Sequence, residues 1–154
     1  MILNYFFSSL LLFVFESNNC ELNFENTGIR KFTSNTKIDD VKIGSSIVKS
    51  LDDKSVIIQF EDKIELNGTK SVIYNLVFKN NKLYNHSFTI KIDNYKEGSS
   101  CFIDFISKID KNNNKFINGD KFAFMETNEK CKKYLRLEYI DINVYIHGGI
   151  IYLK

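Results

Sequence analysis

Cysteine is the residue type with the most chemistry to offer in this chain. Cys20, Cys101 and Cys131 lack the C-x-x-C or Cys/His spacing of a zinc site, so we predict no metal site from them. In an oxidising compartment Cys101 and Cys131 could form a disulfide across a loop of about 30 residues, worth roughly 3–4 kcal/mol by chain entropy. Buried, unpaired thiols are the alternative. Cys20 stands shortly after an apolar segment, where bacterial lipoproteins carry an acylated cysteine, so lipidation of Cys20 is a further hypothesis.

Histidines and carboxylates form no recognisable catalytic motif. His86 and His147 are the only histidines, and neither has a neighbouring motif that would make it a base or a ligand, so we expect surface or turn roles. Adjacent acids such as Asp39 and Asp40 would point to opposite faces of a strand. Segment 110–121 has the oxygen spacing of a calcium loop, but lysines replace its essential glycine and glutamate. We therefore predict no catalytic, cofactor-binding or metal residue, no cofactor and no enzyme.

The tyrosines predict an interaction surface. Because alternate residues of a strand point to opposite faces, several tyrosines must lie on the sheet face away from a covering helix. Tyrosine offers rigid apolar area with a polar tip, which suits recognition. The residues assigned to this surface are Tyr74, Tyr84, Tyr134, Tyr139 and Tyr145. The alternative is that a second layer, such as an N-terminal arm or another subunit, covers that face.

Composition favours one folded domain. The chain has 154 residues, of which 44% are apolar and 14% aromatic, enough for a real core. The formal net charge is only +2, whereas nucleic-acid binders are usually more basic, so we expect no nucleic-acid partner. The one dense basic cluster, Lys130, Lys132 and Lys133, is interpreted as a solvated loop. The lack of proline and tryptophan fits an AT-rich genome and carries no functional information.

The N-terminus predicts export. Residues 2–15 are almost continuously apolar, too short for a bilayer span of about 20 residues but long enough for a secretory signal. We expect a signal segment over 1–19, a polar arm or tether over 20–37 and a single domain over 38–154. The protein would be secreted or held in the cell envelope, with a membrane contact only through a lipid on Cys20. If residues 1–19 instead belong to the fold, the protein is cytoplasmic.

Alternating apolar residues predict a three-stranded antiparallel meander over 56–66, 72–78 and 88–92. Asn67-Gly68 supplies the two-residue turn of the first hairpin, because both residue types tolerate positive φ angles. Asn80-Asn81 supplies the second turn.

Short elements precede the meander and a longer helix follows it. Residues 39–44 are predicted as a strand and 46–51 as a short helix capped by Ser45. Apolar residues at helical spacing predict the main helix over about 100–110, capped by Ser99 or Ser100 and packed on the sheet over Phe78. A C-terminal hairpin, turning at 147–149, completes the sheet. The predicted fold class is α+β, an antiparallel meander packed with one main helix and one short helix.

Residues 38–93 resemble the small envelope domains of the β-lactamase-inhibitor-protein and outer-membrane-assembly-lipoprotein type. The resemblance rests on Lys42-Ile43-Gly44-Ser45 before a short helix and on the strand end Phe78-Lys79-Asn80-Asn81-Lys82-Leu83. Those families have a Gly-Ser or Gly-Met turn and a strand ending in Phe-x-Asn-x-Lys-Leu. The C-terminal part and the residues before Cys20 depart from their pattern. The resemblance implies a non-catalytic protein-binding module of the bacterial envelope.

Three functional hypotheses remain open at this point. The first is an exported or envelope-anchored module that binds another protein through its sheet face. The second is an immunity-type inhibitor of a toxin or hydrolase, since such proteins are also small and free of motifs. The third is a small hydrolase whose site no motif reveals.

Overall fold

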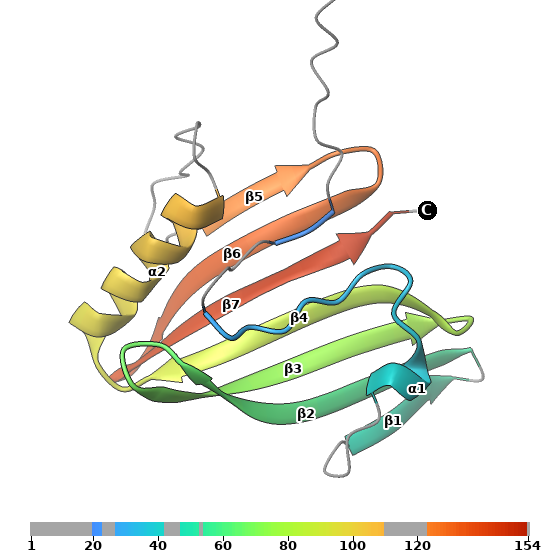
Figure 1. Cartoon of the computed structure of the whole chain (residues 1–154), viewed down its shortest axis with the longest axis horizontal. Coiled ribbons are helices and arrows are strands. Elements are labelled where there is room, and N and C mark those ends of the chain that lie inside the picture. Colours follow the sequence, from blue (N-terminus) through green and yellow to red (C-terminus); the bar gives the residue numbers. More distant parts are fainter. Residues whose placement is uncertain (1–19, 23–26, 42–46, 53, 110–122, 154) are drawn as a thin grey trace, which may run out of the picture.

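A computed structural model describes residues 20–22, 27–41, 47–52, 54–109 and 123–153 (Figure 1). The seven strands of this part form one antiparallel sheet in the order β1-β2-β3-β4-β7-β6-β5. The strands are β1 (Ile47–Asp52), β2 (Ser55–Glu65), β3 (Thr69–Lys79), β4 (Lys82–Ile92), β5 (Ala123–Thr127), β6 (Cys131–Ile140) and β7 (Asn143–Tyr152). The helices are α1 (Ile38–Val41) and α2 (Tyr95–Ile109). The fold is broadly α+β, with strand far exceeding helix.

The meander is confirmed as strands β2, β3 and β4. Its first turn has Asn67 at φ 49° and Gly68 at φ 98°, and its second has Asn80 at φ 51° and Asn81 at φ 60°. These left-handed conformations match the twist of the flanking strands, which is why asparagine and glycine stand there. Lys79 and Lys82 are the cross-strand pair that closes the second turn.

The two short elements before the meander are the reverse of those predicted. Residues 38–41 form helix α1 where a strand was predicted, and the Asp40 carboxylate accepts a hydrogen bond from the Lys37 amide at 3.1 Å. Residues 47–52 form edge strand β1 where a helix was predicted. The apolar spacing there fits both structures, and pairing with β2 decides in favour of a strand. The intervening residues 42–46, including Gly44 and Ser45, lie outside the described part.

The main helix is confirmed, with a different start. The side-chain oxygen of Asn94 accepts a hydrogen bond from the Glu97 amide at 3.1 Å. Asn94 is therefore the N-cap of the helix, rather than Ser99 or Ser100. Helix α2 packs on β7, β6 and β4, with Gly98 against Val144. The structure therefore does not place Phe78, which is buried on β3 beside the β3–β4 turn, beneath this helix.

The C-terminal hairpin completes the sheet as predicted, but its turn is elsewhere. The chain reverses at Asp141, which has φ 54°, and β7 runs without interruption through Gly148 and Gly149. These glycines make room for aromatic rings. A Cβ on Gly148 would lie 2.4 Å from Cζ of Phe88. One on Gly149 would lie 2.5 Å from the His86 carbonyl oxygen and 2.9 Å from the Tyr134 hydroxyl oxygen.

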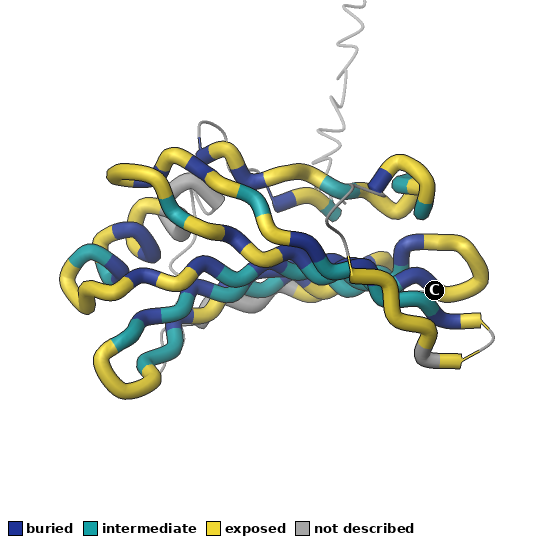
Figure 2. The backbone as a smooth tube through the Cα atoms, turned by 90° about the horizontal axis from the view of Figure 1, so that it is seen from below, coloured by how far each residue is buried: buried dark blue, intermediate teal, exposed yellow. Residues whose placement is uncertain are grey.

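One face of the sheet is covered by α2 and by the N-terminal arm, which we define as residues 20–22 and 27–37 (Figure 1). The predicted polar arm is thus docked on the sheet. Its half-buried Phe32 lies with ring centroids 6.2 Å from Phe60, 5.7 Å from Tyr74 and 5.8 Å from His86. Buried residues alternate with half-buried ones along the strands beneath it (Figure 2). The core therefore lies between the sheet and this layer.

Candidate functional site: the open face of the sheet

The candidate site is the face of the sheet opposite the arm and α2, which we call the open face. No helix or loop of the described ranges packs on it. Strand register brings together side chains from β4, β7 and β6 at its centre. Those residues are Ser87, Thr89, Tyr145, His147, Gly149, Tyr134, Arg136 and Glu138. They are far apart in sequence, which is why no motif revealed them.

A row of polar groups crosses three strands of the open face. Oγ1 of Thr89 lies 2.9 Å from Nδ1 of His147. Nε2 of the same ring lies 3.4 Å from Oε2 of Glu138 but makes no hydrogen bond. That carboxylate oxygen accepts a hydrogen bond from the Arg136 guanidinium at 2.7 Å. The row thus contains a hydroxyl, an imidazole, a carboxylate and a guanidinium within contact of one another.

The imidazole in this row is neutral at physiological pH. Partial burial lowers the pKa of His147 and the positive charge of Arg136 lowers it further, while Glu138 opposes both effects. A neutral ring can accept or donate a proton, so it suits either recognition or base chemistry.

Aromatic side chains lie beside the polar row. The Tyr145 ring stacks near His147, with centroids 6.1 Å apart and planes within 13°. The Tyr134 side chain extends from β6 across Gly149 and forms a hydrogen bond with Ser87 on β4. Burial raises the pKa of the Tyr134 phenol. The centre of the open face is therefore amphipathic.

Only part of the predicted tyrosine surface lies on the open face, namely Tyr134 and Tyr145. Tyr84 lies beside the β3–β4 turn, with the Lys79 ammonium 3.7 Å from its ring centroid. Tyr74 and Tyr139 lie on the covered face, so their assignment was wrong. The error follows from period-two alternation, which separates the two faces of a strand but does not say which face is covered.

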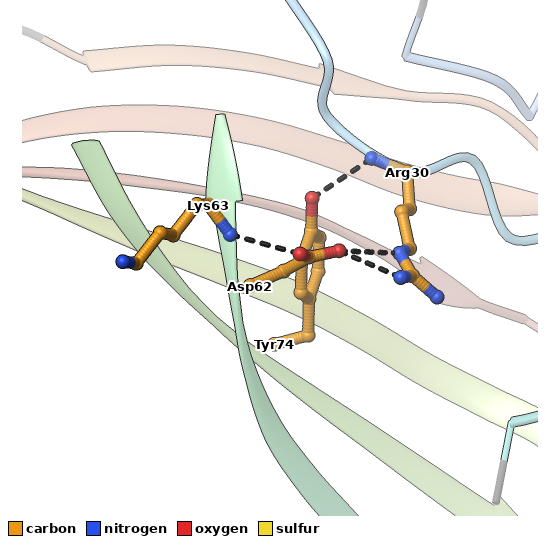
Figure 3. A network of polar contacts seen from close by, with 4 residues as sticks. All are labelled: Arg30, Asp62, Lys63 and Tyr74. Carbon is orange, nitrogen blue, oxygen red and sulfur yellow. Dashed lines mark hydrogen bonds and ion pairs between the residues drawn. The ribbon is translucent and has the colours of Figure 1, made fainter. Parts of the chain in front are cut away.

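Tyr74 helps to hold the arm (Figure 3). Its hydroxyl oxygen accepts a hydrogen bond from the Arg30 amide at 2.8 Å. The Arg30 guanidinium pairs with the Asp62 carboxylate at 2.7 Å. Tyr139 instead stacks on Tyr95 of α2, with centroids 4.7 Å apart.

His86 does not have the expected surface role, because it is buried beneath the arm. It lies between Phe32 and Tyr152, and its Nε2 has no hydrogen-bond partner. Burial lowers the pKa of His86 to about 4, so the ring is neutral at pH 7. It touches no group of the open face and is a structural residue.

The disulfide pairing also differs from the prediction. Cys131 is bonded to Cys20, with Cα atoms 6.0 Å apart, and Cys101 is buried and free. The predicted Cys101–Cys131 bond is therefore wrong. A disulfide uses the Cys20 sulfur that lipidation would need, so the two exclude each other, and lipidation of Cys20 stays an untested prediction. Sequence spacing could not identify the pair, because docking of the arm brings Cys20 to β6.

The basic cluster at 130–133 is divided between the two faces. Lys132 is exposed on the open face, whereas Lys133 is buried on the covered face. No group of three His, Cys, Asp or Glu side chains in the described ranges could hold a metal ion, and the calcium-like segment 110–121 lies outside those ranges. Neither described helix combines the length and apolar character that a bilayer crossing would need.

Comparison with known proteins gives no relative to guide the assignment. No protein-family model, curated protein or solved structure matches this chain.

Proposed function

We propose that this protein is an exported, non-catalytic module that binds another protein on the open face of its sheet. The observation that carries the proposal is that face itself, a surface of tyrosine, histidine and arginine that no described element covers. Such side chains bury large area at a small entropy cost and are enriched at binding hot spots.

Charge suggests the chemistry of the partner. Strand β6 presents Lys132 and Arg136 on the open face against the single carboxylate of Glu138. Because His147 is neutral there, the net charge of this region is positive. We therefore expect a partner surface that carries Asp or Glu side chains.

Two observations support export. The apolar segment 2–15 has the length of a secretory signal, and Cys20 is joined to Cys131. Disulfides persist mainly in oxidising compartments such as the periplasm, the cell surface or the medium.

Photo-crosslinking in the native cells tests the proposal. A benzophenone amino acid at Tyr145 samples the open face, and the same group at Lys96, exposed on α2, is the matched control. We expect one protein to be captured from position 145 and not from position 96. Equal capture from both positions would argue against the open face.

Affinity for the captured and purified protein provides the quantitative test. Arg136→Glu should weaken binding about tenfold or more, because arginine and charge complementarity dominate such surfaces. Lys96→Glu makes the same charge change on α2 and should leave the affinity unchanged. The same experiment addresses the inhibitor hypothesis, since a toxin or hydrolase as the captured protein would favour it.

A hydrolase is the second candidate, favoured by one observation. Thr89, His147 and Glu138 stand in the order hydroxyl, imidazole, carboxylate that activated nucleophiles use. Against it, Arg136 binds the same carboxylate oxygen that faces the imidazole. Hydrolysis of 4-nitrophenyl acetate distinguishes the two candidates. If the protein is only a binding module, any hydrolysis should be the same in the wild type, in Thr89→Ala and in His147→Ala. If it is a hydrolase, both variants should lose the activity.

A further inference from the structure

A hollow of about 300 Å³ lies at the end of the molecule formed by the β3–β4 turn. Its walls come from three segments. These are the β3–β4 turn with Lys79, Lys82 and Tyr84, the end of β7 at Tyr152 with the following Leu153, and Ser34 of the arm. Its volume reaches the lower end of the range for small-molecule sites, about 300–1,000 Å³. It is separate from the polar row of the open face.

The two lysines of the hollow form an unfavourable pair. Lys79 and Lys82 are direct cross-strand partners at the end of the hairpin, and both are exposed. Like charges in this arrangement repel and destabilise a hairpin. Asp52 of β1 offsets part of the charge of Lys79, but its carboxylate already accepts a hydrogen bond from the Lys54 amide at 2.8 Å. An anion between the two ammonium groups would relieve the repulsion.

The other walls offer apolar and aromatic surface. The rings of Tyr84 and Tyr152 and the side chains of Leu83 and Leu153 line the hollow. The Lys79 ammonium is already held over the Tyr84 ring, 3.7 Å from its centroid. Charge and ring surface therefore adjoin within one site.

Hydrogen bonds fix the walls before any ligand arrives. The Asn80 amide donates to the Lys54 carbonyl at 2.8 Å, and the Leu153 amide donates to the Lys130 carbonyl at 2.6 Å. The Tyr152 hydroxyl donates to the Phe32 carbonyl at 3.1 Å, which ties β7 to the arm. Such preorganisation lowers the entropy cost of binding.

We propose that this hollow binds a small aromatic carboxylate. The carboxylate lies between Lys79 and Lys82, and the ring lies against Tyr84 and Tyr152. The site is independent of the open face and of the partner protein.

Titration with 2-naphthoate tests the site, followed through the ring NMR signals of Tyr84 and Tyr152. We expect saturable binding that moves both sets of signals. The neutral analogue 2-naphthamide should bind about tenfold or more weakly, and acetate, which has the charge without the ring, should not saturate. Equal affinity for the acid and the amide would overturn the proposal, and so would a titration that leaves both tyrosines unmoved.

Charge variants assign the binding to the two lysines. Lys79→Gln and Lys82→Gln should each weaken naphthoate binding about two- to fivefold, the range for exposed ion pairs, and the double variant more. Lys91→Gln, an exposed lysine at the other end of β4, removes the same charge and should leave the affinity unchanged. Equal weakening by Lys91→Gln would show a general charge effect and overturn the site.

Discussion

At the scale of single residues, two buried features have consequences that unfolding experiments can measure. His86 is a neutral imidazole under the arm, and Gly148 leaves room for the Phe88 ring in the middle of strand β7. Both arise from neighbours that are distant in sequence.

Stability should fall on acidification because of His86. Its pKa is about 4 in the folded protein and near 6.5 in the unfolded chain, so below pH 6.5 the unfolded state binds more protons. Its contribution is complete above pH 6.5 and is lost as the pH falls towards 4. We expect a loss on the order of 2–3 kcal/mol in the free energy of unfolding, measured with urea at pH 7 and pH 4.

The control for acidification is His86→Phe, which keeps a ring beneath Phe32 and cannot titrate. Between pH 7 and pH 4, this variant should not show the loss in the free energy of unfolding that His86 causes in the wild type. Parallel pH profiles of the two proteins would show that carboxylates, rather than His86, cause the acid sensitivity.

Gly148→Ala should destabilise the protein by about 1–3 kcal/mol, because the new methyl group meets the Phe88 ring in a packed core. Thermal or urea unfolding measures the loss. Adding Phe88→Leu to this variant should recover part of the loss, as a double-mutant cycle would show. Strictly additive effects would mean that the ring is not what excludes a side chain at this position.

At the scale of elements, the arm is the segment whose attachment determines which face of the sheet is available. It is held by the Arg30–Tyr74 hydrogen bond (Figure 3), by the Phe32 ring and by the disulfide to β6. The disulfide spans 111 residues of sequence, so it constrains the unfolded chain strongly.

Loss of the Cys20–Cys131 bond should cost about 2–5 kcal/mol, the usual range for a native disulfide. Cys20→Ser is the variant, and the free energy of unfolding is the measurement. The wild type should show one thiol after denaturation and three after reduction. Cys101→Ala should show no thiol after denaturation. A denatured wild type with three thiols would contradict the bond.

At the scale of the whole molecule, export and the disulfide make a joint prediction about the protein recovered from its native cells. We expect a chain that lacks the first 19 or so residues, is found in the envelope or the medium, and is two protons lighter than its reduced form. Intact mass spectrometry with and without reductant measures all of this. A full-length, fully reduced chain in the cytosol would contradict both the export and the disulfide.

Much of the sheet could be predicted because its signals are local. Alternation in 56–92 and the Asn67-Gly68 turn specify strands and hairpins through neighbouring residues alone. The same is true of α2, whose apolar spacing lies within one segment. The elements at 38–52 were predicted in the wrong order because short segments fit a helix and a strand equally well.

The candidate site could not be predicted, because it is made by register between strands. Thr89, His147 and Glu138 meet only when β4, β7 and β6 pair in the observed order. The two glycines of β7 were predicted as a turn, because the Phe88 ring, the His86 carbonyl and the Tyr134 ring that explain them come from other strands.

The sequence by itself determined the α+β class, the meander and the main helix, because backbone propensity and periodic burial act over a few residues. Only the tertiary structure decided which face the arm covers, which cysteines pair and which polar groups meet on the open face. These features depend on contacts between segments tens of residues apart, and chain spacing does not encode such contacts.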